Sequence, residues 1–476
     1  MFARLLAVFV CGWALATAGW AQAQAPRIVS PLHGVDRALP AEAAWERHEQ
    51  SGRPLPPVEA RPQATSGSDP AKSGEPRWLH VSGEIRDRVE GRTTFNFAPG
   101  TGDGYDLTRL RLNLAVTPAP WLNFFFQAQD ARAPGIETRH LNGSLKEDFD
   151  LRQAYVELAA GPVHRVRFRV GRQELNIGSQ RLIGSSDWGN TARSFNAAQL
   201  TAASKRAQVE VFAASVINTH PTSFGTVQPG VNLYGVYGSL HDAKRRTSIE
   251  PYVFWNTNPH VLSEEGVRGH KNLVTLGVRW TGNWSNHFDS AVEVADQTGS
   301  LSNDSIDAWA GYGIGGYTFA AAPLEPRFSA EYDYASGDQR RGDGRIGTFD
   351  QLYPSNHAPY GIADQVGWRN LRALRLGTNF TPQPKIKANF DYYWFWLASR
   401  FDGLYSSGGV QIVSAPTSGA AHTGIGQEAD VFMTYAVRPE LSLGAGVGSL
   451  FAGPFLKENS TGHGTVYPYA FATYRF

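Results

Sequence analysis

Hydrophobic and polar residues alternate along most of the chain after Trp78. Because successive side chains of a β-strand point to opposite faces, a period of two predicts strands with one apolar and one polar face. Beyond the N-terminus the sequence shows no sustained 3.6-residue period, so the pattern predicts an all-β fold. The clearest alternating runs lie at 110–116, 166–170, 274–280, 328–334 and 386–396.

The connections between these runs alternate in length. Up-and-down barrels of bacterial outer membranes combine short periplasmic turns with longer extracellular loops, and their strands are about 9–11 residues long. The pattern therefore predicts a transmembrane antiparallel β-barrel of about eighteen strands, with both termini in the periplasm. Short turns at 118–120, 161–162, 282–283, 382–384 and 438–440 contrast with long connections at 133–149, 338–368 and 401–424.

A soluble β-sandwich would show a similar alternation and is the main structural rival. The ends of the apolar faces favour the barrel, because they repeatedly carry Trp or Tyr, as at Trp280, Tyr334 and Trp394. Aromatic girdles at the two membrane interfaces explain these residues. A barrel with this number of strands is too wide for its own side chains to fill, and it leaves an aqueous channel.

The N-terminal residues predict export from the cytoplasm. A positive Arg4, an apolar stretch at 5–18 and a small-residue site at 21–23 form the parts of a cleaved signal peptide, with 23–25 as a second cleavage site. We therefore expect a signal peptide at 1–23, a Pro-rich disordered periplasmic leader at 24–76 and the outer-membrane barrel at 77–476. A short recognition segment is the alternative for the leader. Cys11, the one cysteine, lies in the removed segment, so disulfides and thiol catalysis are excluded.

The last predicted strand ends in an aromatic residue. Alternation from Val466 to the terminal Phe476 resembles the C-terminal signature that the bacterial barrel-assembly machinery reads. We therefore expect that machinery and outer-membrane lipid as partners, and the Gram-negative outer membrane as the location. Nucleic acid is not an expected partner, because 44 Lys+Arg balance 43 Asp+Glu and leave no basic excess.

Cations occupy the polar phase of several predicted strands. A cation facing lipid would cost about 2–4 kcal/mol at the bilayer midplane, so these side chains are expected to face the lumen. Guanidinium groups in a wet channel can bind carboxylates of a passing solute. The alternative is an ordinary lumen ladder, neutralised by acids such as Glu84, Glu157 and Glu331, and the sequence leaves both open. The candidate substrate-binding residues are Arg109, Arg111, Arg165, Arg167, Arg169, Arg279, Arg375 and Lys387, and Arg86 shares their phase.

Other motifs predict neither a cofactor nor a metal. GxGxxG occurs at 311–316 and 342–347, but neither opens a helix after a strand, as dinucleotide binding requires. The 13 His are scattered without ligand spacing. Ser, His and Asp all occur, but nothing in the sequence brings a triad together, so we expect no enzyme activity.

Two stretches of the chain contain unusual strings of residues. The first contains GRQEL at 171–175, RLIGSSDWGN at 181–190 and RSF at 193–195; the second contains FDQLYP at 349–354, GWRNL at 367–371 and DYYWFW at 391–396. Both stretches fall at extracellular strand ends and loops, where they can fold back over the pore. They resemble the alginate-export family of outer-membrane barrels, and the resemblance covers about residues 78–476. It implies an eighteen-stranded pore with an electropositive lumen that passes an anionic uronate polymer outward.

The sequence departs from that family in two places. The alginate exporter closes its channel partly with a long periplasmic loop late in the barrel, whereas the matching turn here is the short Arg438-Pro439-Glu440. The leader before Trp78 has no counterpart either. The expected function is an outer-membrane channel for alginate-like or related anionic saccharide. The alternatives are a general or solute-specific uptake porin and, third, a barrel enzyme.

Overall fold

The computed structural model describes residues 78–476 except 162–164, 245, 264–265, 286, 356 and 358. The predicted signal peptide and leader lie outside the described residues. None of the helices in the described part is long and apolar enough to cross a membrane.

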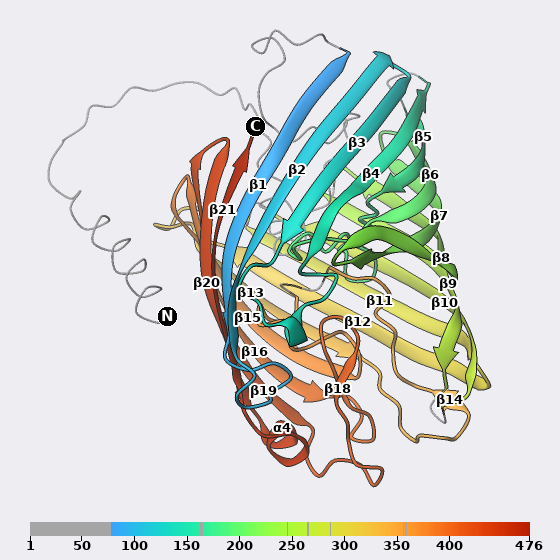
Figure 1. Ribbon diagram of the computed structural model, residues 1–476. Coiled ribbons are helices and arrows are strands. Elements are labelled where there is room, and N and C mark those ends of the chain that lie inside the picture. Colours follow the sequence, from blue (N-terminus) through green and yellow to red (C-terminus); the bar gives the residue numbers. More distant parts are fainter. Residues whose placement is uncertain are drawn as a thin grey trace, which may run out of the picture. The chain divides into compact units, whose positions relative to one another are not determined.

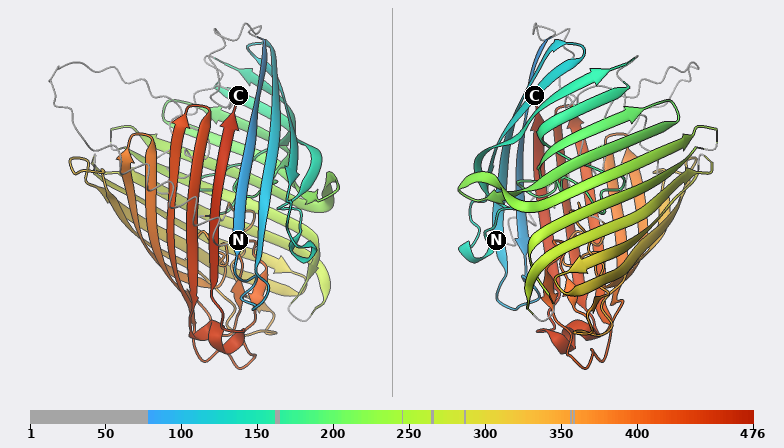
Figure 2. Two further views of the ribbon diagram at one scale, coloured as in Figure 1. Left: turned by 60° about the vertical axis from the view of Figure 1, so that its left-hand side comes forward. Right: turned by 90° about the vertical axis from the view of Figure 1, so that its right-hand side faces the viewer.

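Eighteen long antiparallel strands, counted over the described residues, form one closed sheet (Figures 1 and 2). Each pairs with its neighbours in chain order, as the alternating pattern predicts for an up-and-down barrel. The strands are β1 (Leu79–Arg92), β2 (Asp103–Ala119), β3 (Leu122–Arg132), β4 (Glu147–Ala160), β5 (Val166–Gln173), β6 (Phe195–Ala203), β7 (Ala207–His220), β8 (Ser223–Asp242), β9 (Thr247–Leu262), β10 (Arg268–Asn283), β11 (Phe288–Leu301), β12 (Asp304–Thr318), β13 (Arg327–Ala335), β15 (Leu371–Gln383), β16 (Ile386–Leu397), β19 (Gly424–Arg438), β20 (Leu441–Ala452) and β21 (Thr465–Arg475).

The first and last strands close the barrel. Residues 84–90 of β1 pair with residues 469–475 of β21. The Gly83 amide donates to the Phe476 carbonyl at 2.7 Å, and the Phe476 amide donates to the Gly83 carbonyl at 3.0 Å. Closure satisfies the backbone polar groups that a sheet edge would expose to lipid. The prediction of a barrel with about eighteen strands is confirmed.

The two ends of the barrel differ in their connections. The end that holds the start of β1 and the C-terminus (Figure 1) has short turns, which outer-membrane barrels place in the periplasm. The other end carries the long loops, and we call it extracellular. Those loops contain short elements that the alternating pattern does not predict, including one helix of six residues: η1 (Thr138–His140), β14 (Arg345–Ile346), β17 (Leu404–Tyr405), β18 (Gln411–Val413) and α4 (Pro454–Asn459).

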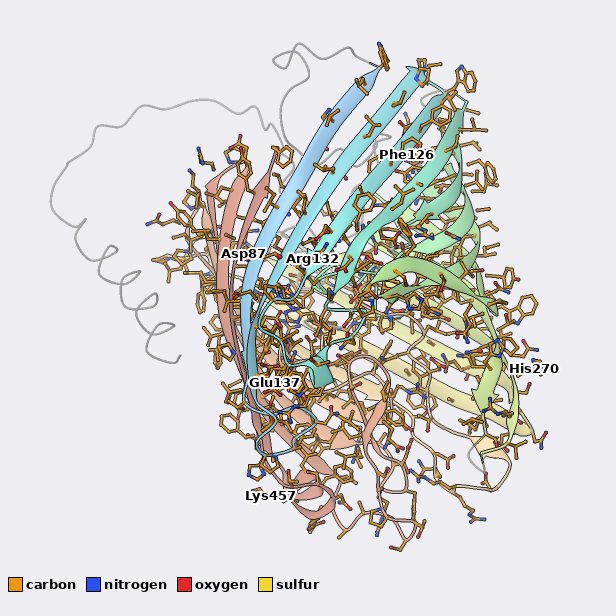
Figure 3. The ribbon with its side chains drawn as sticks, in the orientation of Figure 1. Asp87, Phe126, Arg132, Glu137, His270 and Lys457 are labelled. Atoms are coloured by element: carbon orange, nitrogen blue, oxygen red, sulfur yellow. The ribbon has the colours of Figure 1, made fainter. Side chains whose placement is uncertain are left out.

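Alternation along each strand separates a lipid face from a lumen face. On β2, Leu110, Leu112 and Leu114 are 38%, 46% and 37% exposed on the outside, whereas Arg109 and Arg111 are buried inside. Figure 3 shows Phe126 of β3 on the outer surface, where it is 40% exposed. Outward apolar and inward polar side chains are the arrangement that a bilayer and a wet lumen require.

Two extracellular loops fold back into the barrel: loop 174–194, between β5 and β6, and loop 336–370, between β13 and β15. Their backbones pair inside it. The Tyr353 amide donates to the Leu182 carbonyl at 2.8 Å, and the Gly184 amide donates to the Tyr353 carbonyl at 2.9 Å. Gly361 has φ +86°, and a Cβ there would lie 2.3 Å from a Glu428 carboxylate oxygen of β19, so only glycine fits.

Candidate site in the lumen: arginines that hold a loop carboxylate

The tip of loop 174–194 (Asp187, Trp188 and Gly189) lies against arginines from β1 and β2. Arg111 Nη1 lies 2.7 Å and Arg109 Nη1 lies 3.3 Å from Asp187 Oδ1. The strand alternation places both guanidinium groups on the lumen face, as predicted. The site therefore holds one carboxylate between two guanidinium groups inside the barrel.

Backbone oxygens of the same loop tip bind two further arginines. Arg86 Nη1 donates to the Asp187 carbonyl at 3.1 Å, and its Nη2 donates to the carbonyls of Trp188 and Gly189 at 3.2 and 3.1 Å. Arg88 donates to the Trp188 carbonyl at 2.6 Å. We call Arg86, Arg88, Arg109 and Arg111 the tip cluster.

Acids of the barrel wall also pair with arginines of the tip cluster. Glu84 accepts from Arg109 at 2.6 Å and pairs with Arg475 at 2.9 Å, and Glu90 pairs with Arg88 at 2.7 Å. Burial alone would raise the pKa of Asp187, but the guanidinium groups of Arg109 and Arg111 hold it well below its usual value. The loop carboxylate is therefore ionised beside the guanidinium groups of Arg109 and Arg111.

Trp188 joins the loop tip to loop 336–370. The His357 ring stacks on the Trp188 ring with 3.8 Å between centroids and 6° between planes. The Arg88 guanidinium lies 4.1 Å from the centroid of the same ring. His357 in turn lies 3.0 Å from Asp364. The two loops thus reach the tip cluster as one unit.

Arg279 and Arg375 lie in separate ion-pair networks on other walls. Arg279 of β10 pairs with Glu250 of β9 at 2.7 Å. Arg375 of β15 pairs with Glu331 at 3.1 Å and with Asp391 at 2.9 Å. These arginines face the lumen as predicted, and carboxylates of the barrel neutralise both.

Arg181 of loop 174–194 completes the second of these networks. It pairs with Glu331 and, at 2.6 Å, with Asp333 of β13, and it donates to the Tyr360 hydroxyl at 2.8 Å. Sequence reasoning did not select Arg181, although it stands in the RLIGSSDWGN stretch. Its carboxylate partners lie about 150 residues later in the chain, so only the fold brings them together.

The β5 arginines occupy the periplasmic half of the lumen. Arg169 pairs with Glu157 of β4 at 2.6 Å and lies 4.4 Å above the Tyr155 ring. Arg167 is half-buried and, among the described residues, has no hydrogen bond or ion pair. Arg165 directly precedes β5 at the periplasmic turn and is exposed, so it lies at the mouth of the lumen.

The predicted site residues therefore form separate groups. Arg109 and Arg111 come together with Arg86, Arg165 to Arg169 follow one strand, and Lys387 is half-buried near the periplasmic end of β16. The sequence analysis did not include Arg88. Because Arg88 shares the strand phase of Arg86, its position in the lumen could have been predicted in the same way. Sequence reasoning also missed the role of Asp187 as the carboxylate in the site. No group of three metal-ligating His, Cys, Asp or Glu residues converges among the described residues.

Apolar packing also fixes both loops inside the barrel. Side chains of both loops form one buried cluster with inward residues of β6 to β16. Trp368 is fully buried there, with 5.4 Å between its ring centroid and that of Phe349 and 6.2 Å to that of Tyr312. Leu182 and Ile183 of loop 174–194 belong to the same cluster. On the side of β6 to β16 the loops are thus fixed by apolar packing together with the ion pairs of Arg181, and at the tip cluster mainly by charge.

Comparison with solved structures identifies the same fold in outer-membrane proteins of Pseudomonas aeruginosa. OpdK, solved with vanillate, has a TM-score of 0.57 at 10% identity, and the match covers 84% of this chain and 98% of OpdK. OccK5 (OpdH) has a TM-score of 0.57 at 12% identity, over 84% and 98% of the two chains. OccK11 (OpdR) has a TM-score of 0.56 at 12% identity, over 84% and 96%. At such identities the likeness concerns the fold alone.

No curated protein sequence matches the chain. A family model does: the one described as alginate export matches residues 77–469, which is nearly the whole barrel. The match agrees with the closed eighteen-stranded barrel and with the porin-like fold of the solved structures. The chain is an outer-membrane channel and belongs to the alginate export family.

Proposed function

We propose that this channel passes anionic saccharide, an alginate-like polyuronate or a related acidic sugar, through its arginine-bearing lumen by diffusion. The observation that carries the proposal is Asp187, whose carboxylate lies between Arg109 and Arg111 inside the barrel. A uronate carries the same group on a sugar ring. A lumen that holds one carboxylate with two guanidinium groups has the chemistry to hold another.

The two sets of arginines have different roles in this proposal. Arg167, at the periplasmic end of β5, presents positive charge to the lumen, which raises the local concentration of anions, and Arg169 next to it is paired with Glu157. The tip cluster lies deeper and binds the loop carboxylate. Arg279, Arg375 and Lys387 contribute to the field of the lumen, the first two through pairs that acids of the barrel already neutralise.

A solute-specific or general uptake porin is the second candidate. The buried pairs of Arg279 with Glu250 and of Arg375 with Asp391 favour it, because arginines that acids of the neighbouring strand already neutralise do not bind an anionic solute tightly. An enzyme is the third, and neither the fold nor the family supports it. We also infer cleavage of residues 1–23, a leader at 24–76, and recognition of the last strand by the assembly machinery.

Planar-bilayer recording tests the proposal. At low salt the channel is expected to prefer anions, and an oligouronate should block its current where a neutral oligosaccharide of equal length does not. Replacing Arg167→Glu and Arg169→Glu together should abolish or reverse the anion preference, because lumen substitutions tune selectivity more than stability. The control is Arg372→Glu, at an arginine on the outward face of β15, away from β5. A cation-selective native channel would instead establish the porin alternative.

A further inference from the structure

The periplasmic rim of the barrel carries an uneven distribution of charge. Three neighbouring turns, between β4 and β5, between β6 and β7 and between β8 and β9, each contribute cations. The described ones are all exposed, and they are Arg165, Lys205, Arg206, Lys244 and Arg246. Because β4 to β9 pair in order, these turns lie beside one another along one arc of the rim.

Three of these cations occupy one repeated position. Arg165, Arg206 and Arg246 each directly precede a strand that leaves the rim. The backbone carbonyl of each accepts a hydrogen bond from the next strand: from the Ala203 amide at 2.7 Å, the His241 amide at 2.7 Å and the Asn283 amide at 3.0 Å, respectively. The backbone at each position is thus held in the last rung of the sheet, and the guanidinium groups repeat with the strands.

The same position elsewhere on the rim carries no such run of arginines. Five other residues at the rim directly precede a strand and accept, through their backbone carbonyls, a hydrogen bond from the neighbouring strand. They are Trp78, Trp121, His287, Lys385 and Glu440, and none of them is an arginine. The arginine run is therefore a local feature of the arc from β4 to β9 and does not follow from the fold.

Strand alternation assigns Arg165 and Arg206 to the lumen side of the rim. The outward residues Val166 and Val209 are 41% and 43% exposed on the lipid face, and the two arginines stand one and three positions before them, in the opposite phase. Arg246 continues the row at the start of β9, where its φ of +54° sets it in the turn itself. On β5 the same phase continues inward through Arg167 to Arg169. Cations thus lead from the rim into the lumen.

We propose that Arg165, Arg206 and Arg246 form a periplasmic docking surface for an acidic linear polysaccharide before it enters the channel. The inference rests on the proposed function and adds that the polysaccharide enters the channel from the periplasmic side. Neighbouring strands lie about 4.8 Å apart, so arginines on alternate strands are about 10 Å apart along the rim. A row of cations at regular spacing fits a ligand that repeats its charge along a chain. The lumen phase favours such a solute over the head groups of anionic lipids.

The test compares block from the two sides of a bilayer. The described residues contain no cysteine, so Lys457→Cys in the exposed helix α4 at the extracellular end (Figure 3) marks orientation through a charged thiol reagent. An oligouronate is then added to one side at a time. In the native channel we expect faster block from the periplasmic side, by about tenfold or more at low salt, with the difference lost as salt rises.

The variant Arg206→Gln with Arg246→Gln should remove that difference and leave block from the extracellular side unchanged. Its matched control is Lys385→Gln with Arg438→Gln, which removes two cations from another part of the same rim and should keep the difference. Replacement of both arginines by lysine should restore it. Heat-modifiable migration on gels confirms that each barrel is folded.

The outcomes separate the two proposals. Absence of oligouronate block from either side in the native channel overturns the proposed function. Block that is equal from both sides, or a side difference that survives Arg206→Gln with Arg246→Gln, overturns the docking surface alone. Loss of bound phosphatidylglycerol from that variant in native mass spectrometry, with the side difference intact, would assign the arginines to lipid head groups instead.

Discussion

Two regions of the lumen hold the same loops by different combinations of forces. On the side of β6 to β16, loop residues are buried in an apolar cluster that contains Trp368 and Ile183, and two ion pairs, Arg181 with Asp333 and Asp350 with Lys271, add to it. On the side of β1 and β2, the loop tip is held by hydrogen bonds and ion pairs with four arginines. Apolar packing is non-directional and has no soluble competitor, whereas an anion competes directly for an arginine. The loop tip therefore depends more on charge than the rest of the two loops does, and the following substitutions test that difference.

Removing a large side chain from the apolar cluster should have the largest effect on stability. Trp368→Ala removes a fully buried side chain, and such truncations cost about 3–5 kcal/mol. We expect lower resistance to denaturant in detergent micelles and a larger, noisier conductance, because the loops lose their anchor while the barrel remains closed. Trp309→Ala, on the outer face where Trp309 is 48% exposed, is the matched control. Equal effects of the two substitutions would show that the apolar cluster does not hold the loops.

Breaking the charged side should have a smaller effect on stability but a specific effect on selectivity. Asp187→Asn keeps the shape and removes the charge, at a cost of about 1–3 kcal/mol for the groups left less well satisfied. The freed positive charge of Arg109 and Arg111 should raise anion selectivity and tighten oligouronate block, as measured by reversal potentials and block kinetics.

The control for that substitution is Asp350→Asn in the other loop. Asp350 pairs with Lys271 of β10 at 3.0 Å. Burial opposes its ionisation, but Lys271 and Arg369 keep the pKa of Asp350 below its usual value. Removing this charge alters a pair distant from the tip cluster in the sheet. A gain in anion selectivity as large as that of Asp187→Asn would mean that net loop charge, and no particular site, sets selectivity.

The smallest expected effect concerns the aromatic contact between the loops. Trp188→Leu removes the stack on His357 and the cation–π contact with Arg88, which is worth about 0.5–2 kcal/mol. At about 1 kcal/mol, the tip should leave the tip cluster about fivefold more often. Single-channel dwell times measure that change. Tyr474→Leu, on the outer face of β21, should leave the dwell times as they are.

The fold could be predicted from the sequence because the alternation of apolar and polar residues within a strand indicates which side chains face lipid and which face the lumen. On β2, Leu110 faces lipid and Arg111 faces the lumen, as the alternation of their neighbours predicts. The lumen phase of Arg109, Arg111, Arg279 and Arg375 was predictable on this ground.

The partners of these arginines were not predictable. Arg111 binds Asp187, which is 76 residues later, and Arg181 binds Asp333, which is 152 residues later. No local pattern encodes contacts between a loop tip and a distant wall, and no alternation marks which loop enters the lumen. The motifs at 181–190 and 349–354 indicated a fold over the pore, and the structure shows that they enter it and pair with each other. Substrate contact by any of the predicted residues stays a prediction.

The seam between β1 and β21 has a consequence for biogenesis. Glu84 of the first strand pairs with Arg109 of the second and with Arg475 of the last. The 391 positions between Glu84 and Arg475 make this contact the most non-local of the cluster, and such contacts form late in folding. The whole chain must be synthesised, and β1 must pair with β21, before Glu84 has both partners. Completion of the barrel and completion of the charge arrangement around its arginines are therefore one event, so a nascent chain cannot acquire a finished pore before its wall is sealed.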